Sequence, residues 1–233
     1  MGTIIHTTPT MLIGFAGMTH LGWVMAAAAA EKGFRVQAME DDAARFASAD
    51  LVFLTKDVTV GEDGRGDFEE ILAYHRRVLS LLPPPTPAVI LSQVPPGYTR
   101  ALNRPNTYYQ VETLIYGKSF GRAMEPERFV VGCDDGTIPP IYSAFLEKWD
   151  CPVHLMNYES AELCKLAINA YLVASIECAV RLNTIAVNVG ADWDSVRVGM
   201  QSDARIGPHA YLRPGRWDDS PHLKRDMKTL ETL

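Results

Sequence analysis

The sequence predicts an α/β protein with a parallel sheet in its first part and only helices in its second. Short apolar segments of strand length alternate with helical segments up to about residue 156, an alternation typical of parallel sheets. After residue 156 one long apolar helix leads into short helices and loops, with no further strand pattern. We therefore expect two domains, residues 1–156 and residues 157–233.

The first segments have the layout of a βαβ unit that binds dinucleotides, which predicts a Rossmann-type sheet. A buried strand (11–16) leads through Gly17 into an alanine-rich helix, and a second strand (34–39) ends at Glu40. Gly17 permits the tight turn, and Gly22 lets the helix approach the strand closely. A carboxylate at Glu40 would accept hydrogen bonds from a ribose hydroxyl and repel a 2′-phosphate. NAD is therefore the expected cofactor, rather than NADP.

The glycine fingerprint departs from its usual form at Thr19, which occupies the middle glycine position. The backbone normally approaches the pyrophosphate most closely there. The alternative hypothesis is a domain that kept this fold and lost its ligand. The expected cofactor-binding residues lie in this turn and after the following strands: Gly17, Thr19, His20, Leu21, Gly22, Glu40, Thr55, Ser92 and Gln93.

The remaining elements of the sheet domain follow from apolar runs and breakers. Proline residues end the helical segment 68–82 and form a rigid turn at 94–97. The expected strands are 50–55, 88–92, 129–132 and 153–156, and a further helix is expected near 139–149.

A long helix over 160–188 organises the second part. Ser160 is expected to cap it, and Gly190 to end it. The uncharged run between Lys165 and Glu177 is too short for a membrane span, which needs about 20 apolar residues. A helix this apolar needs a protein surface on several sides, so we expect a homodimer built on it. Asp192 can cap a shorter helix after it.

Composition narrows the function classes. The chain has a net charge of −6, 47% hydrophobic and 21% charged residues, which fits a globular protein and argues against nucleic acid or anionic membranes as partners. The four cysteines have no metal-ligand spacing. The first ten residues lack a signal-peptide pattern, so a cytoplasmic location is expected.

Motifs along most of the chain resemble the UDP-glucose/GDP-mannose dehydrogenase family. Ser92 to Gly97 is similar to the family's S-T-V-P-P-G turn, and Ala161 to Asn169 is similar to A-E-L-x-K-x-x-x-N. Further matches are Gly64 and Asp67, Glu112 to Gly117, Pro126 to Gly132, Arg205-Ile206-Gly207, and Asp226 at the end of G-G-S-C-F-P-K-D.

The resemblance implies roles for named side chains. Family members oxidise a primary alcohol of a sugar nucleotide twice, with two NAD molecules. Lys165, Asn169 and Asp226 would hold a water and stabilise developing oxyanion charge, which suits an ammonium, an amide and a carboxylate. Glu112 would lie beside the hydride-transfer site, and Arg205 would reach a neighbour's substrate across the dimer. The alternative for each is a buried ion pair or a solvated charge.

Departures from the family pattern limit the implied chemistry. Counting back from Asp226 places His222 where the family has its nucleophilic cysteine, and no cysteine follows Cys178. Without a thiolate there is no thiohemiacetal route to an acid. His222 is a candidate acid/base group, because an unperturbed imidazole titrates near neutral pH, or else a surface histidine. The family's P-K-D lysine corresponds to Arg225, or to Lys224 if the gap falls differently.

Two hypotheses follow. The first is an NAD-dependent oxidoreductase limited to one two-electron oxidation of a CH–OH group. The second is a non-catalytic NAD-binding or dimeric scaffold of a biosynthetic pathway. The sequence ends at Leu233, before the family's third, nucleotide-sugar-binding domain, so a separate chain that supplies this domain is a further possibility.

Overall fold

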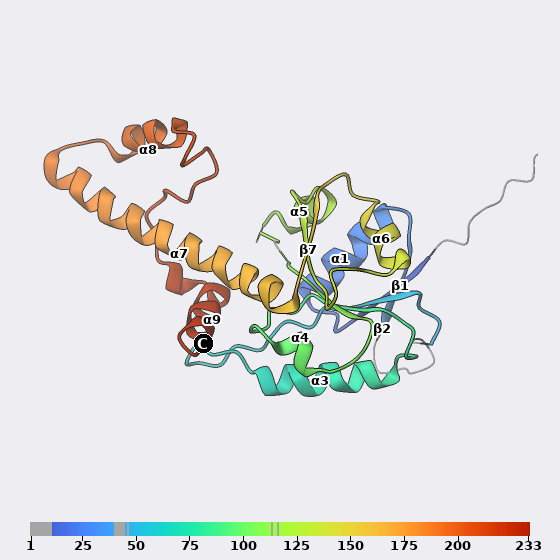
Figure 1. The fold of residues 1–233 in the computed structure, drawn as a ribbon. Coiled ribbons are helices and arrows are strands. Elements are labelled where there is room, and N and C mark those ends of the chain that lie inside the picture. The colour runs from blue at the N-terminus through green and yellow to red at the C-terminus, as the bar shows by residue number, and fades with distance from the viewer. Residues whose placement is uncertain (1–10, 40–44, 46, 113, 116) are drawn as a thin grey trace, which may run out of the picture. The chain divides into compact units, whose positions relative to one another are not determined.

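The computed structural model describes residues 11–39, 45, 47–112, 114–115 and 117–233. The chain divides into two compact units (Figure 1). Unit 1 contains residues 1–59 and 67–165, and unit 2 contains residues 60–66 and 166–233.

Unit 1 is built on one seven-stranded sheet with the order β2-β1-β3-β4-β5-β6-β7. Its strands are β1 (Leu12–Ala16), β2 (Arg35–Met39), β3 (Leu51–Leu54), β4 (Ala88–Ile90), β5 (Thr107–Gln110), β6 (Phe129–Gly132) and β7 (Val153–Met156). The strands β2, β1, β3, β4 and β5 run parallel to their neighbours, as do β6 and β7. This confirms an α/β fold.

The expectation of a uniformly parallel sheet is wrong at one strand pair. Strand β5 was not expected from the sequence, because its Thr-Tyr-Tyr-Gln segment is short and lacks an aliphatic run. It pairs with β6 in antiparallel orientation, with Tyr109 opposite Gly132. The reversal places the end of β5, and Glu112 after it, beside the beginning of β6.

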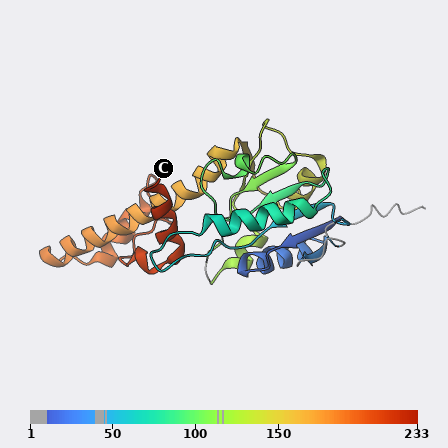
Figure 2. The same cartoon turned by 90° about the horizontal axis from the view of Figure 1, so that it is seen from below.

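Helices cover both faces of the sheet, because successive strand residues point to opposite sides. Ile13 and Phe15 of β1 belong to a core shared with α1 (His20–Glu31), α5 (Ser119–Met124) and α6 (Pro140–Leu146). On the other face, residues of β3 and β4 pack against α3 (Phe68–Leu81) and α4 (Tyr98–Ala101). Figure 2 shows α3 crossing in front of the strands.

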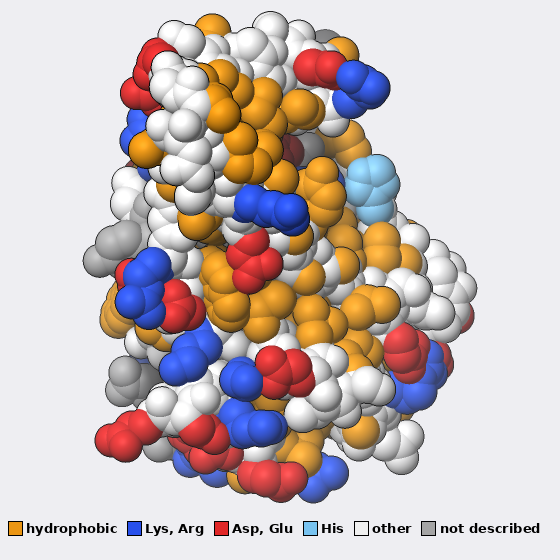
Figure 3. Space-filling model, turned by 90° about the vertical axis from the view of Figure 1, so that its left-hand side faces the viewer, with side chains coloured by type: hydrophobic (Ala, Val, Ile, Leu, Met, Phe, Trp, Pro, Cys, Tyr) orange, Lys and Arg blue, Asp and Glu red, His pale blue; other side chains and the backbone are white. Residues whose placement is uncertain are grey.

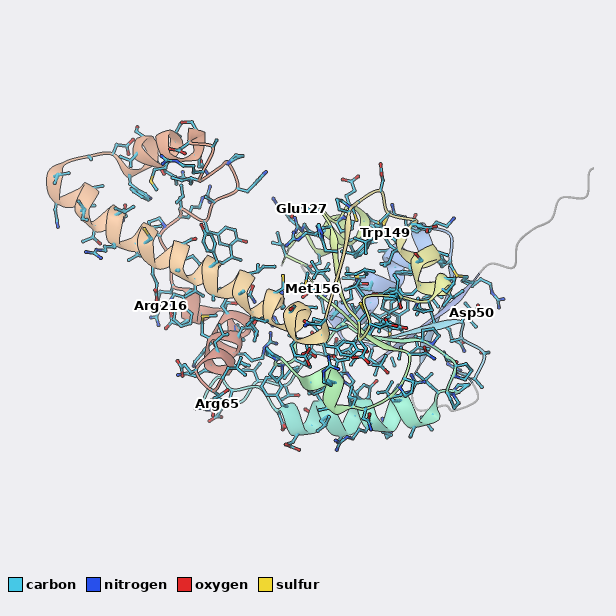
Figure 4. All side chains as sticks on the ribbon, viewed as in Figure 1. Asp50, Arg65, Glu127, Trp149, Met156 and Arg216 are labelled. Atoms are coloured by element: carbon cyan, nitrogen blue, oxygen red, sulfur yellow. The ribbon has the colours of Figure 1, made fainter. Side chains whose placement is uncertain are left out.

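Aromatic rings fill the first of these cores. Phe145 lies 4.8 Å from Phe53 and 4.9 Å from both Phe34 and Trp149, measured between ring centroids. Trp149, which follows α6 (Figure 4), donates a hydrogen bond from its indole nitrogen to the Ala123 carbonyl at 2.8 Å. The core therefore ties α5 and α6 to the sheet without leaving the indole donor unpaired.

The long helix α7 extends over Tyr158–Val189 and begins two residues after Met156, which ends β7 (Figure 4). The expected Ser160 cap is wrong. Instead, the Asn157 side chain accepts a hydrogen bond from the Ser160 amide at 2.9 Å, so the cap lies three residues earlier. Among the described residues, α7 has the length and hydropathy that a membrane span would need, and 28% of that window is buried.

The helices of unit 2 have local signals that the sequence shows. Asp192 caps α8 (Trp193–Ser202), as expected, by accepting from the amides of Asp194 and Ser195. Ser220 caps α9 (Pro221–Leu230), which follows the short 3₁₀ helix η1 (Trp217–Asp219). A small core joins Ala179 and Ala186 of α7 to Trp193 of α8.

Candidate functional site

The turn between β1 and α1 depends on two glycines. Gly17 has a φ of +77°, a conformation that other residues rarely adopt. A β-carbon on Gly22 would lie 2.5 Å from the Thr55 hydroxyl oxygen, so only glycine allows α1 to approach the end of β3 this closely. The Thr55 hydroxyl donates a hydrogen bond to the Ala16 carbonyl at 2.9 Å, so the oxygen that excludes a side chain at residue 22 is held in position.

The Thr19 side chain is held on the sheet side of this turn. Its hydroxyl donates a hydrogen bond to the Thr55 carbonyl at 2.9 Å. Thr19 is the amino-terminal cap position of α1 but makes no side-chain cap hydrogen bond. The first amides of α1 are therefore left without a cap from this residue, which suits an anion at the helix amino terminus.

His20 stands at the start of α1 and reaches α5. Its Nε2 lies 3.2 Å from the Ser119 hydroxyl oxygen, and Ser119 donates its own proton to the Ile115 carbonyl at 3.0 Å. Ser119 can therefore only accept from His20, so the Nε2 of His20 carries the proton. Leu21 is buried in the core, and its side chain contributes packing rather than polar contacts.

Behind the end of β4, a buried histidine that sequence reasoning missed connects two segments. His75 of α3 is fully buried, with Nε2 3.2 Å from the Ser92 hydroxyl and Nδ1 2.9 Å from the Tyr98 hydroxyl. Ser92 donates to the Lys56 carbonyl at 2.5 Å, so it accepts from His75, and Tyr98 donates to Nδ1. Burial, helped by the charge of Lys56, lowers the pKa of His75 to about 3. The imidazole is therefore neutral and fixes Ser92. The sequence contained one signal for this buried histidine: His75 falls on the apolar face of the predicted helix 68–82.

A second polar group in unit 1 contains Glu112, Gln93 and Lys165. The Gln93 amide nitrogen donates to Glu112 Oε2 at 2.8 Å, and Lys165 Nζ lies 3.6 Å from the same oxygen. The backbone amide of Leu114 also donates to Glu112. All three residues are buried. Because a carboxylate only accepts, the Gln93 amide oxygen must point away from it, and this buried oxygen has no partner among the described residues.

Unit 2 contains a separate buried polar group of Asn169, Arg225 and Asp226. Asn169 donates to one Asp226 oxygen at 2.6 Å, while Arg225 Nε donates to the other at 2.7 Å. Arg225 and Asp226 are each 1% exposed. Lys224 is only half-buried and lies against Gly64 of the 60–66 segment.

The other predicted site residues are placed differently. Arg205 is exposed and paired with Asp203 at 2.7 Å, and His222 is exposed at the start of α9. Glu40 lies outside the described residues. No cluster of potential metal ligands occurs among the residues that the structure describes.

Cavities alone do not locate the site. A cavity of about 20 Å³, enough for one water molecule, borders Glu112 and Arg122. Two larger cavities in the described parts of the chain, of about 490 Å³ in unit 2 and about 670 Å³ in unit 1, are lined by none of the predicted catalytic or cofactor residues. Within unit 1, the group of Glu112, Gln93 and Lys165 and the glycine turn therefore define the candidate site.

Unit 1 therefore has a Rossmann-type α/β fold, with an uncapped helix amino terminus and a buried lysine on the long helix that follows the sheet. Residues 159–233 match the model of the UDP-glucose/GDP-mannose dehydrogenase family, central domain. The UDP-glucose 6-dehydrogenases of Bacillus subtilis and Pseudomonas aeruginosa are 27% and 29% identical to this chain over 180 and 181 residues. These matches cover 72% and 70% of the chain.

A solved UDP-glucose dehydrogenase from Pyrobaculum islandicum has the same fold, with a TM-score of 0.80 at 21% identity. The match covers 100% of this chain and 66% of that one. Over these ranges the chain is similar to members of the UDP-glucose/GDP-mannose dehydrogenase family. It spans about two-fifths of the length of the two curated relatives, 41% and 40%.

Proposed function

We propose that this protein is an NAD-dependent oxidoreductase that converts a CH–OH group of a sugar or sugar nucleotide into a carbonyl in one two-electron step. The Glu112–Lys165 pair carries the proposal. It holds a buried ammonium on the helix that follows the nucleotide-binding sheet. A buried cation next to one carboxylate can stabilise alkoxide-like charge where water cannot screen it.

The residues of the glycine turn fit an NAD molecule. The first amides of α1 can bind the pyrophosphate, and the Thr19 side chain, turned to the Thr55 carbonyl, leaves the middle position of the fingerprint compatible with a ligand. NAD would supply the hydride acceptor for the oxidised carbon. Lys165 would stabilise the negative charge that develops on the substrate oxygen as its proton leaves to water or to a neighbouring carboxylate.

The reaction is proposed to stop at the aldehyde or ketone. The family's thiolate position has no cysteine in this sequence, because the four cysteines are Cys133, Cys151, Cys164 and Cys178. The thiolate that would form the covalent intermediate of a second oxidation is therefore missing from this position. Whether Asn169, Asp226, His222 and Arg205 contribute to turnover stays a prediction.

We further propose a cytoplasmic homodimer. Large apolar side chains are exposed on α7 and α8, including Tyr171 at 75%, Val187 at 69%, Val189 at 72% and Val198 at 66%. Figure 3 shows hydrophobic side chains at the surface, among charged and other side chains. An exposed apolar surface of this kind is typical of a subunit interface.

Calorimetric titration with NAD and NADH tests the nucleotide site first. We expect binding in the micromolar range, and an absence of heat at millimolar NAD would contradict the proposal. NADH formation on a panel of UDP- and GDP-sugars then tests turnover. Lys165→Ala should abolish it, whereas Lys148→Ala, an exposed lysine of unit 1, should leave it unchanged. Unchanged turnover in Lys165→Ala would reject the proposed chemistry. Nucleotide binding without turnover on any alcohol would instead favour the scaffold hypothesis.

A further inference from the structure

A buried carboxylate that the proposed function does not use lies one helical turn before Lys165. Glu162 is completely buried. Its Oε2 accepts from the Gly97 amide at 2.6 Å and its Oε1 accepts from the Thr99 amide at 2.8 Å. Burial raises the pKa of Glu162. The side chain thus joins the first turns of α7 to the turn that follows β4.

These contacts close a ring of interactions, which we call the Glu162 ring. Glu162 accepts a hydrogen bond from the 93–99 turn. Gln93, at the start of that turn, donates a hydrogen bond from its side-chain amide to Glu112 at 2.8 Å. Glu112 in turn lies 3.6 Å from Lys165, which returns to Glu162 along one turn of α7. Every member belongs to unit 1.

Helix stability alone does not account for a glutamate at this position. An exposed carboxylate in the first turns would interact with the helix dipole without being desolvated. Burying a carboxylate costs several kcal/mol, and only well-aligned donors offset that cost. The two donors here are backbone amides, which fix the carboxylate in space better than a flexible side chain would. We therefore interpret the buried carboxylate as a group that fixes the position of α7 rather than one that stabilises the helix.

We propose that Glu162 is the positioning residue for Lys165. By fastening α7 to the turn that carries Gln93, it keeps the Lys165 ammonium beside Glu112. Glu162 has no contact with the reacting groups in this scheme, and its effect on turnover is exerted through Lys165. The catalytic part of this inference rests on the proposed function, whereas the effect on Lys165 itself does not.

The test uses Glu162→Gln, which keeps the shape but turns one acceptor into a donor facing a backbone amide. Glu159→Gln is the matched control. Glu159 lies on the same helix, and the substitution removes the same charge, but from an exposed pair with Arg100. The full chain is labelled with acetic anhydride without any nucleotide, and the acetylation rate of Lys165 is measured by mass spectrometry. An exposed lysine, Lys148, is the internal reference.

We expect Lys165 to be acetylated about tenfold faster in Glu162→Gln, the factor that corresponds to losing one hydrogen bond of typical strength, and at an unchanged rate in Glu159→Gln. A folded Glu162→Gln protein with a lower Tm but an unchanged Lys165 rate would overturn the proposal, because Glu162 would then be only structural. If Glu162→Gln does not fold, Glu162→Asp, which shortens the side chain by one methylene, gives the same comparison.

Turnover provides the second readout once a substrate has been found. Glu162→Gln should lower kcat while the Kd for NADH stays within about threefold, since Lys165 is displaced but the glycine turn is intact. A changed labelling rate in a protein without turnover would reject the proposed function and retain the positioning role. An unchanged labelling rate of Lys165 in an active enzyme would reject the positioning role and retain the proposed function.

Discussion

Asn169 donates a 2.6 Å hydrogen bond to Asp226, a residue 57 positions later in the chain. The same carboxylate neutralises the buried Arg225 guanidinium, whose Nη2 lies 2.6 Å from Asp226 Oδ1. Both oxygens of Asp226 are thus engaged by donors from α7 and α9. The Asn169–Asp226 pair, which the family resemblance predicts, therefore links α7 to α9 within unit 2.

Removing the charge of Asp226 should strongly destabilise unit 2. We expect Asp226→Asn to lower the free energy of unfolding by about 3–5 kcal/mol, because the Arg225 charge would remain buried without a partner. Asp194→Asn, which breaks an exposed pair with Arg197, should cost less than about 1 kcal/mol. Guanidinium unfolding followed by circular dichroism measures both. Equal costs would show that the Arg225–Asp226 pair is not buried in solution.

The neutral His75 predicts a specific sensitivity to acid. Its pKa is lowered from 6.5 to about 3 by burial, so below pH 6.5 the unfolded chain binds a proton that the folded chain does not. The stabilisation is complete above pH 6.5 and declines by about 1.4 kcal/mol for each pH unit below it. Between pH 7.5 and 5, the wild type should lose about 2 kcal/mol more than His75→Asn, measured by urea unfolding.

Tyr98→Phe is the control for this pH effect. It removes the hydrogen bond to His75 Nδ1 but no group that titrates in this range. Its destabilisation should therefore be similar at both pH values. An identical pH dependence in wild type and His75→Asn would mean that another group causes the loss of stability in acid.

Gly22 should tolerate no side chain. In Gly22→Ala the new methyl group would lie 2.5 Å from the Thr55 hydroxyl oxygen, which is held by two carbonyls. We expect a loss of about 1–3 kcal/mol and a large decrease in NADH affinity. Gly121→Ala in α5 is the matched control, since nothing lies within 4 Å of its added β-carbon. Tm and calorimetric Kd are the measurements, and a normal Kd in Gly22→Ala would argue against a nucleotide in this turn.

The apolar residues exposed on α7 and α8 predict self-association. Sedimentation velocity at micromolar concentration should show a dimer for the wild type. Val187→Glu together with Val198→Glu should shift it to a monomer, because burying carboxylates in an apolar interface is unfavourable. Val153→Glu, at an exposed position of β7, is the control and should stay dimeric. A monomeric wild type would contradict the homodimer.

Much of the fold was accessible from local patterns. The apolar runs of β1, β3 and β4 predicted a buried sheet, because strands covered on both faces contain few polar residues. Gly17, Asp192 and Gly190 marked turns and helix ends through properties of single residues. Strand β5 was missed, since its residues become a strand only through pairing with β4 and β6.

The sequence by itself determined most of the strands and helices, β5 excepted, the glycine turn after β1, and the family that the protein resembles. Those properties depend on neighbouring residues, so spacing and residue type reveal them. Only the tertiary structure decided that Glu112 holds Lys165, that His75 is neutral, and that Glu162 fastens α7 to the turn after β4. Each of these depends on desolvation and on donors tens of residues away, and no local pattern encodes either.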